Sequence, residues 1–447
     1  MLKVKNYSFL STLKHRINGG MVLMTMAVLA MIIANSPLGD NYQALWQYPI
    51  GLQIGDFNLF SHHGEPLTLM AFINDALMAL FFFSVGLEIK REIMVGELSS
   101  PRKALLPVIA AFGGMVIPVL CYFFIAHTEP ESNGLAIPMA TDIAFSLGVL
   151  SLFGKRVPIS LKIFLTAFAV VDDIGGILVI AFFYTQDLAT DYLIASAVVL
   201  AVLYLGNRLG VMHRIFYIAF GIVMWYFFLQ SGIHCTIAGV IIAFVIPARP
   251  NLQVTHYVNR IRESISKFPV SVTDKKDDNI VLDSEQINEL KSIEAASNRV
   301  ISPLQSLENS MHGWVNYFIM PLFAFANAGV VLDGGMDSIG TVTLAVLFGL
   351  TIGKFIGLYV FTMLAIKFRI VNMPHGMNYK NLAGVSLLGG IGFTVSLFIA
   401  NLSFDNGYDE LLNQAKLGVL MGTIIAGVLG YIVLNMVLPK EQVEVEA

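Results

Sequence analysis

The chain has 447 residues, of which 56% are apolar and only 13% are charged, and its mean hydropathy is +0.72. A soluble domain usually carries about a quarter charged residues, so this composition excludes an ordinary soluble fold and indicates a membrane protein. The length accommodates about a dozen spans of roughly 20 residues each. Cys121 and Cys235 both lie in apolar runs, which argues against a disulfide framework or a cysteine metal site.

Apolar segments recur along the whole chain. The first is read as a permanent span rather than a cleaved signal peptide, because the polar segment MLKVKNYSFLSTLKHR precedes it and no small-residue cleavage site follows soon after it. The predicted spans are 19–36, 67–88, 104–126, 134–154, 159–184, 191–206, 213–228, 231–247, 313–331, 339–366, 382–403 and 414–437. The chain is therefore predicted to be a single all-α polytopic membrane domain over residues 1–447, with about twelve transmembrane helices.

The loops between these spans alternate in charge. Positive residues precede the first span and follow every even-numbered span, whereas the odd-numbered loops contain neither Lys nor Arg. The positive residues are Lys3, Lys5, Lys14, Arg16, Lys90, Arg91, Arg102, Lys103, Lys155, Arg156, Arg208, Arg214, those between Arg249 and Arg299, Lys367, Arg369, Lys380 and Lys440. By the positive-inside rule, both termini are predicted to be cytoplasmic.

Two loops are long. Residues 42–62 include the alternating run YPIGLQIGDFNLF, with Gly-Asp between two short halves, which predicts a small β-hairpin on the outer face. The hairpin is either solvated or a dimer contact. Residues 249–312 form a charged cytoplasmic insertion between the eighth and ninth spans, in which VTDKKDDNIVLDSEQ is expected to be mobile and INELKSIEAASNRVI has helical spacing.

Three acids and a lysine lie inside apolar runs. Asp142 is in MATDIAFSLGVLSLF, Asp172 and Asp173 are adjacent in LTAFAVVDDIGGILVIAFF, and Lys354 is isolated in VLFGLTIGKFIGLYVF. A charge in hydrocarbon is costly, so such residues usually face an aqueous cavity and mark an ion or proton pathway. Because neighbours on a helix point about 100° apart, one aspartate of the pair is expected to face a cavity and the other a neighbouring helix.

Two of the spans carry signals of interruption. Pro138 removes a backbone hydrogen bond shortly before Thr141 and Asp142, and GVSLLGGIGFTVSLF is rich in glycine in the second half of the chain. Helices broken at mid-membrane expose carbonyl oxygens and helix ends to an ion, and matching breaks in the two halves are typical of inverted repeats. Carboxylate, hydroxyl and carbonyl oxygens suit alkali cations and protons. Lys354 either neutralises a buried aspartate or itself releases a proton when sodium enters.

Further charged residues lie nearer the ends of the spans. Glu88, Arg91 and Glu92 in GLEIKRE share a helix face, for which interfacial salt bridging is the default explanation. Asp75 in FINDALMALFFF lies deeper in the same span. His234 in SGIHCTIAG is read first as a packing residue and second as a proton sensor.

Together these segments resemble the NhaA family of bacterial sodium/proton antiporters. The resemblance rests on FFFSVGLEIKREIMVGEL, AIPMATDIAFSLGVL, KIFLTAFAVVDDIGG, SGIHCTIAGV, PLFAFANAGV, IGKFIGL and GGIGFTVSLFIA, which occur in the order of the family and cover nearly the whole chain. It implies twelve helices in inverted repeats, crossed and interrupted fourth and eleventh helices, and a homodimer in the inner membrane. It also implies electrogenic exchange of internal Na⁺ or Li⁺ for a larger number of external protons, in sodium and pH homeostasis, without a cofactor.

The resemblance also implies roles for individual residues. Asp172 and Asp173 match the essential aspartate pair, with Asp173 the central Na⁺ ligand, and Lys354 matches the buried partner of Asp172. Thr141 and Asp142 match the extended segment at the helix crossing. Residues that match the family's pH-response positions, or an acid of its second helix, are Asp75, Glu88, Arg91, Glu92, His234 and Glu308.

The chain departs from the family pattern near Glu308. The insertion before it is longer than in the best-known members, Asn309 stands where those have histidine, and Gly313 replaces a proline. The ion-site residues are intact, so the departures bear on the pH range of activation rather than on transport.

Three other functions compete with antiport. An intramembrane aspartyl protease also needs two acids on facing helices, but its Gly-x-Gly-Asp signature is missing, since the acids follow Thr141 and Val171. A cation channel does not require carboxylates tied to a lysine. A proton-coupled carrier of organic solutes fits the membrane class but not a site made of hard oxygen ligands.

Overall fold

The computed structural model describes residues 19–51, 53–54, 57–58, 60–62, 65–185, 188–249, 254–268, 284–331, 339–404 and 407–439. Four predicted cytoplasmic cations, Lys3, Lys5, Lys14 and Arg16, lie outside these ranges, as do Lys440 and residues 272–283 of the stretch expected to be mobile. Within the ranges, helices occupy all twelve predicted apolar segments.

The twelve spans are mostly single helices, and some contain a π-helical turn or a break. In chain order they are α2 (Gly19–Ala34); α4, η1 and α5 (Leu69–Phe72, Ile73–Leu77 and Met78–Val95); α6 (Pro101–Ile125); η2 and α7 (Glu131–Met139 and Ile143–Ser151); α8 (Ile159–Phe183); α9 (Thr190–Arg208); α10 (Arg214–Ser231); α11 (Thr236–Val245); α14, η4 and α15 (Pro303–Trp314, Val315–Ile319 and Met320–Asn327); α16, η6 and α17 (Thr341–Phe348, Gly349–Gly353 and Lys354–Lys367); α18 and α19 (Tyr379–Leu388 and Phe393–Ser403); and α20 (Asp409–Val437).

Length and composition support membrane insertion. Among the described residues, seven helices are long and apolar enough to cross a membrane, or up to ten if each bent pair counts as one span. Large apolar side chains such as Phe124 and Phe182, each 79% exposed, cover the outside of the bundle. An exposed apolar surface of this kind needs lipid around it. The chain is therefore a multi-pass membrane protein, as its composition predicts.

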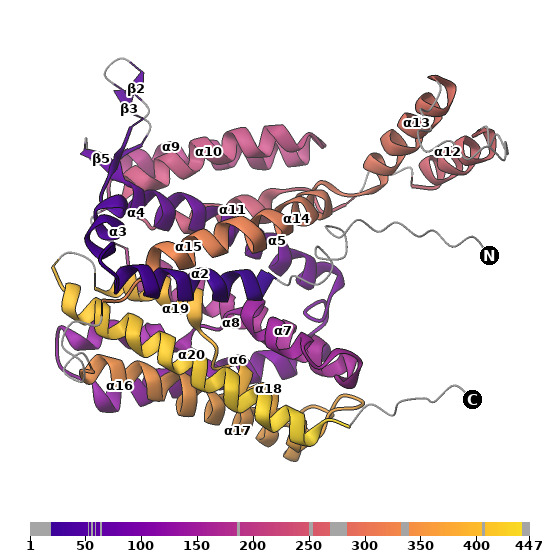
Figure 1. Ribbon diagram of the computed structural model, residues 1–447. Helices are drawn as coiled ribbons and strands as arrows, with labels where there is room; N and C mark the ends of the chain where they lie inside the picture. The colour runs from indigo at the N-terminus through magenta and orange to yellow at the C-terminus, as the bar shows by residue number, and fades with distance from the viewer. Residues whose placement is uncertain are drawn as a thin grey trace, which may run out of the picture.

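Strands gather at one end of the bundle. β2 (Gln53–Ile54) pairs with β3 (Phe57–Asn58), while β5 (Glu65–Thr68) lies between β1 (Pro49–Ile50) and β4 (Ser61–His62), all antiparallel. The predicted small hairpin is confirmed, but residues 42–46 are helical, because α3 (Gly39–Trp46) follows α2 after a bend of 117°. Tyr42 and Trp46 are buried against Phe325, which holds α3 on the bundle. We call this end the hairpin face (Figure 1). We call the opposite end the basic face, because the loops that contain Lys and Arg are those that follow the even-numbered spans.

The insertion contains two helices beyond the basic face. α12 (Val254–Lys267) and α13 (Ser284–Val300) pack on each other and project away from the spans, as Figure 1 shows at the end opposite the strands. α13 covers most of the stretch whose spacing predicts a helix, whereas the sequence reading missed α12. Its run VTHYVNRIRESISK has apolar residues at helical spacing, which is the signal that was available.

The spans form two groups. One, the broken-helix bundle, comprises α6, η2–α7, α8, α16–α17, α18–α19 and α20. The other, the panel, comprises α2, α5, α9, α10, α11 and α14–α15. Contacts are dense within each group, and the groups meet mainly where α2 touches α7, α5 touches α8 and α15 touches α19. The two cavities described below lie along this junction.

Close backbone approach fixes the broken-helix bundle. A Cβ added at Gly113 of α6 would lie 2.4 Å from the carbonyl oxygen of Gly357 on α17, and one added at Gly357 would lie 2.1 Å from the Gly113 carbonyl. Small residues allow membrane helices to pack at this distance, where dispersion rather than the hydrophobic effect holds them together. The approach of α17 to α6 brings Lys354 into the interior.

Arg156 ties the loop after α7 to the end of α20. Its guanidinium donates to the carbonyls of Pro439 at 2.9 Å and Leu438 at 3.2 Å, and to the side-chain oxygen of Asn435 at 2.9 Å. It also lies 5.7 Å from the centre of the Phe153 ring. A cation at a helix C-terminus satisfies carbonyls that have no partner within the helix.

We expect Arg156→Ala to lower stability by about 1–3 kcal/mol, because several charge-assisted hydrogen bonds to these carbonyls are lost together. The thermal midpoint of the purified protein in detergent measures this. Arg208→Ala is the matched control, since Arg208 donates to Tyr204 of its own helix, and we expect almost no change. Equal midpoints for the two variants would contradict the role given to Arg156.

Candidate functional site

The two broken spans cross at their breaks. η2 and α7 meet at 43°, α18 and α19 at 44°, and the two spans run in opposite directions, as an inverted repeat requires. The amide of Asp142 donates to the carbonyl of Ile391 at 2.7 Å, and the Thr141 hydroxyl donates to the Gly389 carbonyl at 2.8 Å. Ser396 in turn donates to the Ile137 carbonyl at 2.8 Å. Each broken span thus provides hydrogen-bond partners for backbone groups at the break of the other. A single unwound helix surrounded by lipid would have no such partners.

Asp142 occupies the N-terminal ends of two helices. Its carboxylate caps α7 by accepting from the Phe145 amide at 3.0 Å, and it accepts from the amide and hydroxyl of Thr394 at 3.3 and 2.5 Å at the start of α19. Helix N-termini carry partial positive charge, so one carboxylate balances both. Thr394 lies in the Gly-rich run that indicates the break, but sequence reasoning did not single it out as a partner of Asp142.

Asp172 and Lys354 form a fully buried ion pair. The Lys354 ammonium lies 2.8 and 3.0 Å from the two carboxylate oxygens, and both side chains have no exposed surface. The ammonium also donates to the Met139 carbonyl in the first broken span and lies 5.6 Å from the centre of the Phe168 ring. Lys354 follows directly after the π-helical turn η6, and such turns often occur at functional sites.

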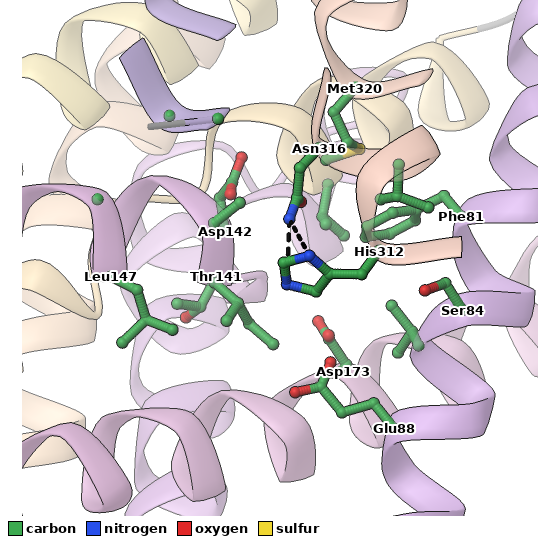
Figure 2. A pocket seen from close by; sticks show the side chains of 18 of the residues that line it. Phe81, Ser84, Glu88, Thr141, Asp142, Leu147, Asp173, His312, Asn316 and Met320 are labelled. Carbon is green, nitrogen blue, oxygen red and sulfur yellow. Dashed lines mark hydrogen bonds between the residues drawn. The ribbon is translucent and has the colours of Figure 1, made fainter. Parts of the chain in front are cut away.

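Asp173 faces the other way, into an open space. It lines a cavity of about 410 Å³, the basic-face cavity, together with Thr141, Asp142 and Glu88. Figure 2 shows the Asp173 and Glu88 side chains pointing into this space. Asp173 is 5% exposed and has no hydrogen-bond or ion-pair partner among the residues that the structure describes. A buried carboxylate without a partner is costly unless it binds a proton or a cation.

A charged cluster lies at the mouth of the same cavity. The Arg91 guanidinium lies 2.7 Å from Glu308, 3.1 Å from Glu92 and 4.0 Å from Glu88. Arg91 therefore joins α5 to α14, the helix that follows the insertion. His312 also lines the cavity, one turn after Glu308, and its ring makes a hydrogen bond of 3.2 Å with Asn316 (Figure 2).

Asp75 and His234 lie elsewhere. They line a second cavity of about 570 Å³ that opens at the hairpin face, and neither borders the cavity that holds Asp173. Asp75 is carried by the π-helical turn η1, and the Nε2 atom of His234 is buried with no hydrogen-bond partner among the residues described. Lys416 of α20 lines this cavity with only 8% exposure. Sequence reasoning did not consider it, although a lone lysine at the edge of an apolar run was a visible signal.

This site defines a class of protein. Carboxylates and a lysine are held at the crossing of two broken helices, at the base of a cavity that opens on one face, as expected of a secondary transporter of ions. The donors beside Asp173 at the base of the cavity, those of Thr141 and Asp142, are hard oxygens, which fit an alkali cation as a transported substrate.

The chain belongs to the NhaA family of Na⁺/H⁺ antiporters. The family model described as "Na+/H+ antiporter 1" matches residues 11–434. A protein named Na⁺/H⁺ antiporter NhaA from Phocaeicola vulgatus is 63% identical over 438 residues, which cover 98% of this chain and 97% of that protein. The NhaA of Bacteroides fragilis is 60% identical over 427 residues (95% and 97%), and NhaA 1 of Saccharophagus degradans is 44% identical over 423 residues (93% and 89%). The predicted family and its fold are confirmed.

Proposed function

We propose that this protein exchanges internal Na⁺ or Li⁺ for external protons, electrogenically and with more protons than cations per cycle, in sodium and pH homeostasis. The observation that carries the proposal is the carboxylate of Asp173, which has no partner in the described part of the chain and faces a cavity open to the basic face beside the Asp172–Lys354 pair. The names of its relatives, Na⁺/H⁺ antiporters, support the choice of ions.

The proposed mechanism is competition for carboxylates. At the basic face, Asp173 releases a proton and binds Na⁺, with Thr141 and Asp142 as neighbouring oxygens. The broken-helix bundle then moves relative to the panel, and protons from the other side displace Na⁺. Lys354 either stays charged as the counterion of Asp172 or releases a proton when Na⁺ arrives; the ion pair is compatible with both. The inward proton gradient thus drives sodium out.

The surroundings of the transporter are part of the proposal. The distribution of Lys and Arg supports an inner-membrane protein with both termini and the 249–312 insertion in the cytoplasm. The basic-face cavity then opens inward. A homodimer held through the hairpin is proposed from the family resemblance.

The charged groups away from the central site are proposed to adjust activity to pH. Arg91 bridges Glu88, Glu92 and Glu308 at the mouth of the cavity, so protonation of any of these carboxylates changes the field through which a cation enters. Asp75 and His234 are proposed to act in the same way from the hairpin-face cavity.

Competition has a measurable pH dependence. A proton and Na⁺ exclude each other at the same carboxylate, so the apparent Na⁺ affinity is constant above the pKa of the site and falls below it. For one competing proton the loss approaches about tenfold per pH unit, and for two coupled protons it is steeper. Everted vesicles that hold a proton gradient, followed with a pH-sensitive dye, give the Na⁺ concentration for half-maximal gradient collapse at each pH.

The same vesicles separate the alternatives. Li⁺ and K⁺ are added in parallel, and prompt collapse with Na⁺ or Li⁺ is expected. An apparent Na⁺ affinity that is the same at every pH would contradict direct competition. An electrical current far larger than carrier turnover allows would indicate a channel. No response to any cation would indicate that the substrate is an organic solute.

A further inference from the structure

The two cavities end against the same helix. The basic-face cavity is lined by α2, α5 and α14–α15 of the panel and by α7, α8 and α19 of the broken-helix bundle. The hairpin-face cavity is lined by α4–η1 and the turn before α11 on the panel side and by residues of α19 and α20 of the bundle. Val395 of α19 borders the first cavity and Phe398 borders the second. About one helical turn therefore separates them.

Aromatic side chains fill this separation. Phe398 is fully buried, and its ring centre lies 5.7 Å from that of Phe82, 6.4 Å from Phe323 and 5.3 Å from His234. Phe398 belongs to the broken-helix bundle, whereas the three rings around it belong to the panel and the turn before α11. The seal between the cavities is therefore a contact between the two groups of helices.

A partly buried polar contact at the edge of the hairpin-face cavity crosses the same junction. The Asn401 amide donates to the side-chain oxygen of Asn327 at 2.7 Å. Asn327 has no exposed surface, and its own amide donates to the side-chain oxygen of Asn74 at 3.0 Å and to the Phe323 carbonyl at 3.1 Å. Of these partners only Asn401 belongs to the broken-helix bundle, so its bond alone must break when the bundle moves against the panel.

We propose that the Asn401–Asn327 hydrogen bond is a latch that favours the arrangement open to the basic face. Sliding the bundle past the panel leaves the Asn327 oxygen without its donor in a buried setting, until water from the hairpin face replaces it. The latch thus raises the free energy of the first step of opening at the hairpin face. The aromatic contacts around Phe398 exclude water from the path between the two cavities. This inference rests on the proposed exchange function, which needs both arrangements.

Thiol accessibility tests the latch. Cys235 is 2% exposed and lines the hairpin-face cavity, so it reports opening on that face. Ser84 lines the basic-face cavity, and Ser84→Cys reports access from the other side. The Cys235 reporter carries Cys121→Ala, and the Ser84→Cys reporter carries Cys121→Ala and Cys235→Ala. A membrane-impermeant thiosulfonate is added to either face, by using intact cells for one face and everted vesicles for the other.

The isosteric variant Asn401→Leu is expected to raise the Cys235 reaction rate from the hairpin face about tenfold, as for the loss of one net hydrogen bond. The Ser84→Cys rate from the basic face should fall or stay the same, because a minor arrangement can gain tenfold while the major one loses little. Asn74→Leu is the matched control, because it removes a hydrogen bond to the same Asn327 inside the panel; both rates should stay within about twofold. If Asn401→Leu fails to fold, Asn401→Ser is the second variant, because it removes the amide and its shorter side chain does not reach the Asn327 oxygen.

No rise at Cys235, a rise in the Ser84→Cys rate, or an equal rise at Cys235 in Asn74→Leu would overturn the latch. Thiol rates require neither Na⁺ nor a proton gradient, so they assess the latch even if the proposed exchange is wrong. The exchange itself is tested separately through Asp173.

Discussion

Replacing Asp173 with Asn is expected to abolish Na⁺-driven collapse of a proton gradient while leaving the protein folded. Even groups that only support a metal ligand change affinity by about 10–100-fold, so removal of the central carboxylate should cost more than about 100-fold in apparent Na⁺ affinity. Asparagine has nearly the same shape, cannot exchange a proton and carries no charge for Na⁺. The dye assay in everted vesicles measures the loss across the pH range.

The thermal stability of Asp173→Asn distinguishes loss of the ion site from loss of the fold. Asp173 has no partner among the described residues, so Asn at this position removes an uncompensated buried charge. The thermal midpoint should therefore stay the same or rise, as is common when a functional but unfavourable group is replaced. Asp191→Asn, an exposed acid in the first turn of α9, is the control and should leave transport unchanged. Normal exchange by Asp173→Asn would show that the ion binds elsewhere.

Lys354→Gln is expected to destabilise the protein by about 3–5 kcal/mol, because it leaves the Asp172 carboxylate buried and uncompensated. The pair has no exposed surface, and the ammonium contacts both carboxylate oxygens within 3.0 Å, so water cannot easily replace it. The thermal midpoint of the purified protein in detergent measures the change. Lys367→Gln, at the exposed end of the same helix α17, should have almost no effect.

The double variant tests the cause. Lys354→Gln with Asp172→Asn removes both charges and should recover much of the midpoint, since a neutral pair carries no desolvation penalty for charge. A double variant as unstable as the single one would indicate that Lys354 acts mainly through the Met139 carbonyl. Transport by the double variant reports separately whether the pair moves a proton: loss of the extra proton per cycle, without loss of exchange, would assign that proton to the Asp172–Lys354 pair.

Much of this protein is determined by the order of its residues alone. Lipid leaves an unpaired backbone group no partner, so each long apolar run must become a helix, and the spans follow from hydropathy together with the alternation of loop charge. The chemical types at the candidate site could also be predicted, because Asp142, Asp172, Asp173 and Lys354 are each conspicuous in an apolar run.

Only the tertiary structure decided which partner and which surroundings each of these residues has. The local residue pattern does not show that Asp172 meets Lys354 while Asp173, its neighbour, is left facing a cavity, and only the family resemblance implied this division. The rotation of α8 depends on how α5, α6 and α7 pack around it. Nor does the local pattern reveal that Asp142 balances the ends of two helices, or that Asp75 and His234 lie in a different cavity. Each of these facts joins residues far apart in the chain, and such contacts depend on the packing of whole helices rather than on any local pattern.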